Sequence, residues 1–236
     1  MRIEPFGVDS IVHVTKRGTR GMALARDDGD RLRFVKSLYY LNDSHSDPYL
    51  HETIADLPLF ERPPDWPEHD PLVRILAWTL LSNHFHLLLQ EIREGGIARF
   101  MQGLGGSMTK CYNLKYKERG SIFQSLYHGK VIDEDAHLTY LGFYILVKNV
   151  LEMYPGGLRE AQKNFDDAWA WAVQYPWSSF SGHISGSHTP IIEVSDNPLV
   201  DIMGCGDECK HQARELLDLH IDSHGEEYKD LMLEFW

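Results

Sequence analysis

Two apolar segments joined by a two-residue turn constrain this sequence most strongly. Arg74 to Leu81 and His84 to Gln90 are each apolar enough to lie inside a sheet, and Ser82-Asn83 separates them. Antiparallel strands are readily joined by a loop of two residues. The pattern therefore predicts a β-hairpin near the centre of a sheet.

The second of these segments carries two histidines, in Ser82-Asn83-His84-Phe85-His86-Leu87-Leu88. Successive side chains of a strand point to opposite faces, so His84 and His86 should project together and Phe85 away from them. Neutral imidazole nitrogens can bind a divalent metal. A bare His-x-His pair is more often held by hydrogen bonds at the edge of a core. A metal-binding interpretation therefore needs support from the rest of the chain.

Length and composition favour one substantial domain, with or without an appended subdomain, because 236 residues with 43% hydrophobic content can build a proper core. The chain has no run of about eighteen apolar residues and no apolar N-terminal signal region. Its three cysteines suggest no disulfide framework. We therefore expect a cytoplasmic protein with no membrane partner.

The net charge of −12 argues against a nucleic-acid partner, but the basic residues are concentrated locally. From Ile92 to Lys130 there are seven basic residues against two acidic ones, and Ile11 to Arg20 contains three basic residues and no acid. The histidine pair lies between these blocks. That distribution permits an anionic substrate.

The remaining pattern predicts a mixed α+β chain. Ser10 to Arg17 is β-branched and should form a first strand, whereas Asn42 to Asp70 is rich in Pro, Asp and His and should be a partly irregular insertion. Asp27 or Asp28 should cap the first helix. The helices are expected over about Asp30–Leu41, Ile97–Lys117, a stretch carrying Leu138 to Leu151, Leu158–Tyr175 and Cys209–His224. After Phe180 the chain should be loop-like through Pro198.

Five segments, in order, resemble the HUH single-strand DNA transposases, in the branch of the REP-associated tyrosine transposases. Beside the histidine motif these are Val12 to Gly18, Gly120-Ser121-Ile122-Phe123-Gln124-Ser125, the helix containing Tyr144-Ile145, and Tyr175-Pro176-Trp177-Ser178-Ser179-Phe180. The resemblance covers most of the chain but not the insertion at 42–70.

The resemblance implies a ferredoxin-like antiparallel sheet flanked by helices. It divides the chain into an HUH transposase-like catalytic domain over residues 1–155, with the insertion at about 42–70, and a helical C-terminal extension over 156–236. Its implied activity is the nicking and rejoining of single-stranded or hairpin DNA by a monomer or homodimer. Tyr144 would attack the phosphodiester to give a 5′-phosphotyrosine, with Mg²⁺ or Mn²⁺ held by His84 and His86.

The third metal ligand departs from the family pattern, which places an Asn or Gln four residues after the tyrosine. Here Lys148 stands at that position and Asn149 follows it. In a regular helix Asn149 would lie about 140° round from Tyr144. A π-bulge would return Asn149 to the face of the tyrosine and make it the third ligand. Alternatively the alignment slips by one, Ile145 takes the nucleophile's position and the enzyme is inactive, or Tyr140 is the nucleophile.

Basic and polar side chains are the candidates for DNA contacts, with aromatic side chains as stacking partners. A catalytically inactive DNA-binding protein that keeps the fold is the alternative from another class, and a hydrolase of small phosphoesters is a third. The candidate DNA-binding residues are Lys16, Arg17, Arg20, Lys110, Lys115, Lys117, Arg119, Gln124 and Lys148.

Overall fold

The computed structural model describes residues 6–186, 189–192, 197–203 and 207–222. In chain order the elements are β1 (Ile11–Arg17), the 3-10 turn η1 (Thr19–Gly21), α1 (Asp28–Tyr40), α2 (Leu50–Thr53), β2 (Val73–Leu80), β3 (His84–Glu91), α3 (Gly96–Tyr116), β4 (His128–Ile132), α4 (Asp135–Phe143), the π-helical turn η2 (Tyr144–Lys148), α5 (Asn149–Glu152), α6 (Leu158–Lys163), α7 (Phe165–Val173), α8 (Phe180–Ser185), α9 (Pro198–Met203) and α10 (Asp207–Asp222).

The four strands form one antiparallel sheet in the order β2-β3-β1-β4. Helix α1 connects β1 to β2, and α3 connects β3 to β4, so two βαβ units interlock with their strands alternating in the sheet. This is the ferredoxin-like topology. The expected α+β fold class, with its antiparallel sheet and flanking helices, is confirmed, and so are the C-terminal helices.

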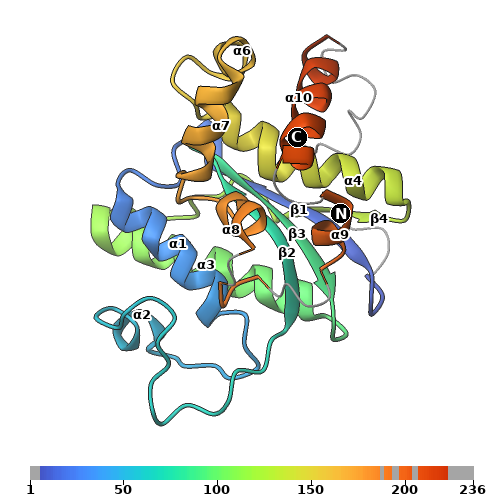
Figure 1. Ribbon diagram of the computed structural model, residues 1–236. Coiled ribbons are helices and arrows are strands. Elements are labelled where there is room, and N and C mark those ends of the chain that lie inside the picture. The colour runs from blue at the N-terminus through green and yellow to red at the C-terminus, as the bar shows by residue number, and fades with distance from the viewer. Residues whose placement is uncertain (1–5, 187–188, 193–196, 204–206, 223–236) are drawn as a thin grey trace.

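Helices cover both faces of the sheet (Figure 1). Helices α1 and α3 lie on one face over a core that contains Phe34, Phe85 and Phe100, all fully buried. Helices α4 and α5, with η2 between them, lie on the other face, and α7 and α10 share that second core. The sheet therefore separates two hydrophobic layers, and polar side chains on the second face are covered by α4, η2 and α5.

The predicted hairpin is confirmed. Strands β2 and β3 pair directly, and the Leu81 amide donates to the His84 carbonyl across the Ser82-Asn83 turn at 2.9 Å. Along β3, Phe85 belongs to the core beneath α1 and α3, whereas Leu88 belongs to the core beneath α4. His84 and His86 have the parity of Leu88, so both face the layer that contains η2.

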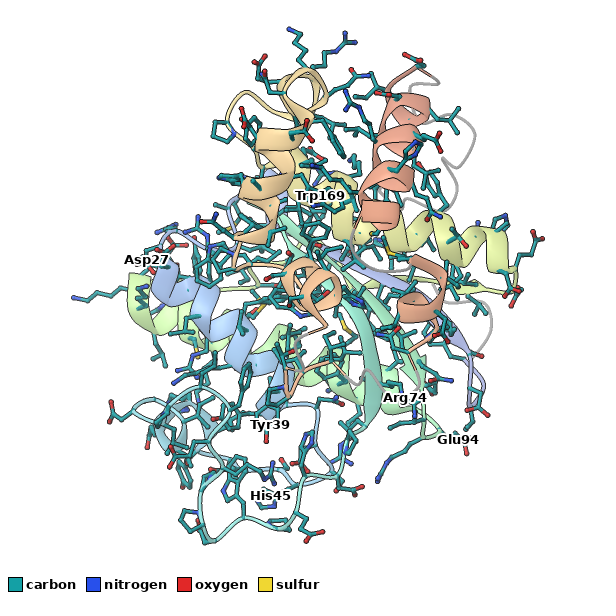
Figure 2. All side chains as sticks on the ribbon, viewed as in Figure 1. Asp27, Tyr39, His45, Arg74, Glu94 and Trp169 are labelled. Carbon is teal, nitrogen blue, oxygen red and sulfur yellow. The ribbon has the colours of Figure 1, made fainter. Side chains whose placement is uncertain are left out.

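The insertion packs against the end of α1 (Figure 2). The Lys36 ammonium donates to the carbonyl oxygens of Ile54, Ala55 and Leu57 at 2.8, 3.3 and 2.8 Å. The ring of Tyr39 contacts those of Phe60 and His69. The expectation of a partly irregular insertion is confirmed, since α2 is its helical part, and these contacts hold the irregular part in place.

The helices differ in part from those expected from the sequence. Asp27 is the cap of α1, because its side chain accepts from the Asp30 amide. The single helix expected over Leu158–Tyr175 is wrong: Asn164 has a non-helical backbone and separates α6 from α7. The loop expected after Phe180 is wrong at its start, because α8 extends to Ser185. His224, the expected end of the last helix, lies outside the described residues.

No helix in the described part of the chain is both long enough and apolar enough to cross a membrane.

Candidate functional site

A row of polar side chains crosses the face of the sheet beneath η2. Thr79 on β2 and Thr15 on β1 are the two register partners of His86 on β3. All three side chains are buried, with exposed fractions of 5% or less. His13 lies two residues before Thr15 and shares its face. The sheet thus places a polar patch within the second, otherwise apolar layer.

His86 has one ring nitrogen in a hydrogen bond and one without a partner. Its Nδ1 lies 2.9 Å from Nε2 of His13, while its own Nε2 is buried and makes no hydrogen bond. If Nδ1 carries the proton and donates to His13, Nε2 keeps a lone pair. A metal-binding histidine commonly donates its other N–H in this way, which fixes both tautomer and ring orientation.

His84 is arranged similarly. The Asn83 side-chain oxygen accepts from His84 Nδ1 at 2.7 Å, so Nε2 of His84 carries the lone pair. Its ring centroid is 4.9 Å from that of His86. Burial lowers the pKa of His84 to about 4, and burial together with His13 and His84 lowers the pKa of His86 well below its usual value. Both imidazoles are therefore neutral at neutral pH, the form that binds metals.

The helix above this patch changes its winding at the tyrosine. Helix α4 ends at Phe143, five residues from Tyr144 to Lys148 form a π-helical turn, and Asn149 begins α5. The Asn149 amide donates to the Tyr144 carbonyl, an i→i+5 bond that makes one wide turn. The predicted π-bulge is confirmed, and it places Asn149 one turn above Tyr144 instead of 140° away.

Tyr144 is fully buried and lies against the histidines. Its ring centroid is 5.6 Å from that of His86 and 6.5 Å from that of His13, both in edge contacts. Tyr140, one turn earlier, instead forms a 2.9 Å hydrogen bond between its hydroxyl and Nδ1 of His220 on α10. His220 also packs on Tyr144, with ring centroids 6.2 Å apart, so α10 covers the tyrosine.

Lys148 is also buried. Its ammonium binds the Glu152 carboxylate at 2.8 Å and lies 4.7 Å from the centre of the Tyr144 ring. A charged lysine cannot ligate a metal. It can instead place a positive charge beside the phenol, and Glu152 balances that charge.

Asn149 is the most unusual residue of the patch. It has no exposed surface, and neither its side-chain oxygen nor its nitrogen has a hydrogen-bond partner. An unsatisfied buried polar group costs about 1–3 kcal/mol, and such groups are rare in folded proteins. With His86 Nε2, three polar atoms are thus buried without partners in one layer.

These residues fit a divalent cation. Two imidazole nitrogens and an amide oxygen would make a mixed N/O donor set, which suits Mn²⁺ better than Mg²⁺, since Mg²⁺ prefers oxygen ligands alone. Within the described residues no three His, Cys, Asp or Glu side chains could hold a metal together, so His84 and His86 would need a donor of another kind, such as the Asn149 amide. The set carries no negative charge, which leaves room for an anionic ligand on the metal.

Comparison with known proteins gives a distant structural likeness. No family model and no curated protein sequence matches this chain. Among solved structures, a REP-associated tyrosine transposase bound to a REP hairpin is similar, at 15% identity and a TM-score of 0.45. The match covers 83% of this chain and 91% of the other. An identity and a TM-score this low leave the function to be decided by the chain's own residues.

The candidate DNA-binding residues do not form a single surface. Arg17 pairs in register with His84 and so lies beside the patch. Lys16 points to the opposite face, where it is buried against Phe123 and donates to the Ser125 carbonyl. Lys115 binds Asp27 and Asp30. Lys110 approaches His51, and Arg20, Lys117, Arg119 and Gln124 are exposed.

The segment Tyr175 to Phe180 covers the outer edge of β2. The Leu80 amide donates to the Trp177 carbonyl, and the Ser179 amide donates to the Trp78 carbonyl, each at 2.9 Å. Thr79 forms an isolated bridge with Ser178. An edge strand that would otherwise leave its amides unpaired is thereby paired on both sides, which fixes β2 beside the histidines.

Sequence reasoning missed His13, Thr79 and His220 as parts of this patch. His13 interrupts a β-branched strand, which is a weak signal of a polar role, but its pairing with His86 depends on strand order. Thr79 has no distinguishing signal in an apolar strand. His220 comes from the last described helix, whose docking on α4 no local pattern predicts.

Proposed function

We propose that this protein nicks and rejoins single-stranded or hairpin DNA through a covalent bond to Tyr144, with a divalent cation bound by His84, His86 and Asn149. One observation carries the proposal. The unpartnered Nε2 of His86 and the unpartnered amide of Asn149 occur in the same buried layer as the Tyr144 ring. A metal-binding role accounts for those atoms, and a tyrosine beside a metal is equipped to attack a phosphodiester.

The chain's own residues would divide the work as follows. The Tyr144 oxygen bonds to phosphorus, the P–O3′ bond breaks, and the proton lost by the phenol is balanced by the one that the 3′-oxygen gains. A tyrosine is a poor nucleophile because its ordinary pKa is about 10. The Lys148 ammonium, 4.7 Å from the ring centre, favours the negative charge that develops on the phenol oxygen. A bound cation would supply Lewis-acid stabilisation of the phosphate.

The covalent bond would conserve the energy of the phosphodiester. A free 3′-hydroxyl can attack the 5′-phosphotyrosine in reverse, so rejoining or strand transfer needs no nucleotide cofactor. Arg17, next to His84 on the sheet, is the best placed of the candidate basic residues to contact the substrate's phosphates.

Burial of the tyrosine supports a second candidate, an inactive protein that binds hairpin DNA. Tyr144 has no exposed surface and lies beneath His220 of α10, so the DNA can reach it only after that end of α10 moves. If α10 stays in place, the fold would bind DNA without cutting it.

One experiment separates the two. The full chain is incubated with Mn²⁺ and a radiolabelled hairpin DNA with single-stranded flanks, and covalent adducts are resolved on a denaturing gel. We expect an adduct that maps to Tyr144 by mass spectrometry and is lost in Tyr144→Phe, while Tyr140→Phe retains it. Salt-sensitive DNA binding without any adduct would favour the inactive protein, and an adduct that survives Tyr144→Phe would refute the assigned nucleophile.

A further inference from the structure

A side chain of the sheet forms a hydrogen bond to the backbone of the π-helical turn. The Thr79 hydroxyl donates to the carbonyl oxygen of Ile145, the second residue of η2. A π-turn shifts the i→i+4 ladder by one residue, so a carbonyl beside the shift can lose its usual amide donor and accept from a partner outside the helix. Thr79 is fully buried and supplies one.

Thr79 itself is held in a fixed position relative to the metal-binding candidates. It pairs in register with His86 on one side and bridges to Ser178 on the other. Strand β2 is thus paired along both edges at this point. The Thr79 hydroxyl therefore holds the Ile145 carbonyl in a fixed position relative to His86.

The register of the turn decides which side chain follows Tyr144 on its face. In an α-helix the residue four later, Lys148, lies nearly above the tyrosine, and Asn149 lies about 140° away. In the π-turn Asn149 takes that place, as its i→i+5 bond to Tyr144 shows. Relaxation of η2 to α-helical winding would therefore move the Asn149 amide off the face of Tyr144 and put Lys148 in its place.

We propose that Thr79 is a positioning residue: its hydroxyl holds η2 in the π register, which keeps Asn149 and Tyr144 together on the side of His86. This inference rests on the proposed function for the identity of the metal ligands. The effect of the Thr79 hydroxyl on the winding of η2 does not depend on the proposed function and can be measured without metal or DNA.

The test compares three variants of the full chain. Thr79→Val removes the hydroxyl at nearly constant volume, and Thr79→Ser keeps it. Thr15→Val is the matched control, because the Thr15 hydroxyl also bonds a backbone carbonyl, that of Phe85 at 3.0 Å, on the other side of His86 and away from the turn. Each protein is measured for Mn²⁺ affinity, for hydrogen–deuterium exchange of peptides covering 144–152, and for thermal stability.

We expect Thr79→Val to weaken Mn²⁺ binding about tenfold or more, as for other residues that orient metal ligands, and to raise exchange in 144–152. Thr79→Ser should restore both. Thr15→Val should lose a comparable amount of stability. It should change the Mn²⁺ affinity and the exchange in 144–152 by no more than about twofold, because its hydroxyl does not contact the turn. The inference would be overturned if Thr15→Val and Thr79→Val lost Mn²⁺ affinity equally, or if Thr79→Val kept normal exchange and normal Mn²⁺ affinity. If the wild-type chain binds no Mn²⁺, the metal site fails while the exchange data still decide whether Thr79 holds the turn.

Discussion

Replacing Asn149 by leucine should stabilise the protein in the absence of metal. Both polar atoms of the Asn149 side chain are buried without partners, so removing them recovers about 1–3 kcal/mol of desolvation for each atom. Leucine has a similar size but a different shape, so imperfect packing should offset part of that stabilisation. The net expectation is about 2 kcal/mol. For a chain of 236 residues this raises the melting temperature by about 4–8 °C.

Asn42 provides the matched control, because it is a buried asparagine whose side chain is fully bonded. Its nitrogen donates to the Val73 carbonyl at 2.8 Å, and its oxygen accepts from the Leu72 and Val73 amides at 3.0 and 2.9 Å. Asn42→Leu leaves those backbone groups without partners and should cost about 3 kcal/mol or more. The same chemical substitution is therefore expected to have opposite signs at the two positions.

Differential scanning calorimetry with EDTA and with Mn²⁺ measures both effects. At a Mn²⁺ concentration one hundred times its Kd, the wild-type protein should gain about 2.7 kcal/mol, and Asn149→Leu should lose most of that gain. A metal-binding role of Asn149 is refuted if Asn149→Leu destabilises the metal-free protein as Asn42→Leu does, or if the variant keeps the full stabilisation by Mn²⁺.

Three other predictions concern Lys148, Lys36 and His84. Lys148→Met should slow adduct formation about tenfold with little change in Mn²⁺ affinity, because it removes the charge beside Tyr144 but no ligand; equal effects on both would contradict this role. Lys36→Met should cost about 3 kcal/mol and raise hydrogen exchange in residues 50–57, since three carbonyls lose their donor; unchanged exchange there would show that the insertion is held otherwise. The pKa of His84 is about 4 in the folded protein and ordinarily about 6.5. Between pH 4 and 6.5 the unfolded chain therefore binds more protons than the folded protein. The free energy of unfolding should fall as the pH drops from 6.5 to 4. Denaturant titrations at several pH values measure this slope, which His84→Gln should reduce.

The sheet and its histidine face could be predicted because they depend on short-range pattern. Alternation along β3 fixes which side chains share a face, and two residues between apolar strands specify a hairpin. The π-turn could also be anticipated, since a lysine at the expected ligand position followed by an asparagine requires one extra residue in the turn.

The partners of the histidines could not be predicted, because they come from strand order and helix docking. His13 reaches His86 only because β1 lies beside β3 in the sheet. Thr79 looks like any β-branched residue of an apolar strand until η2 is placed above it. The basic blocks misled in part for the same reason: Lys115 is bound by Asp27 and Asp30, acids some 85 residues away in the sequence.

The most direct test of the account is a crystal structure of the full chain soaked with Mn²⁺, with anomalous scattering data collected at the manganese absorption edge. We predict an anomalous peak bonded to Nε2 of His84, Nε2 of His86 and the side-chain oxygen of Asn149, next to the Tyr144 ring. An anomalous map with no peak between these three side chains at saturating Mn²⁺, or a cation bound by the two histidines with Asn149 turned away, would contradict it.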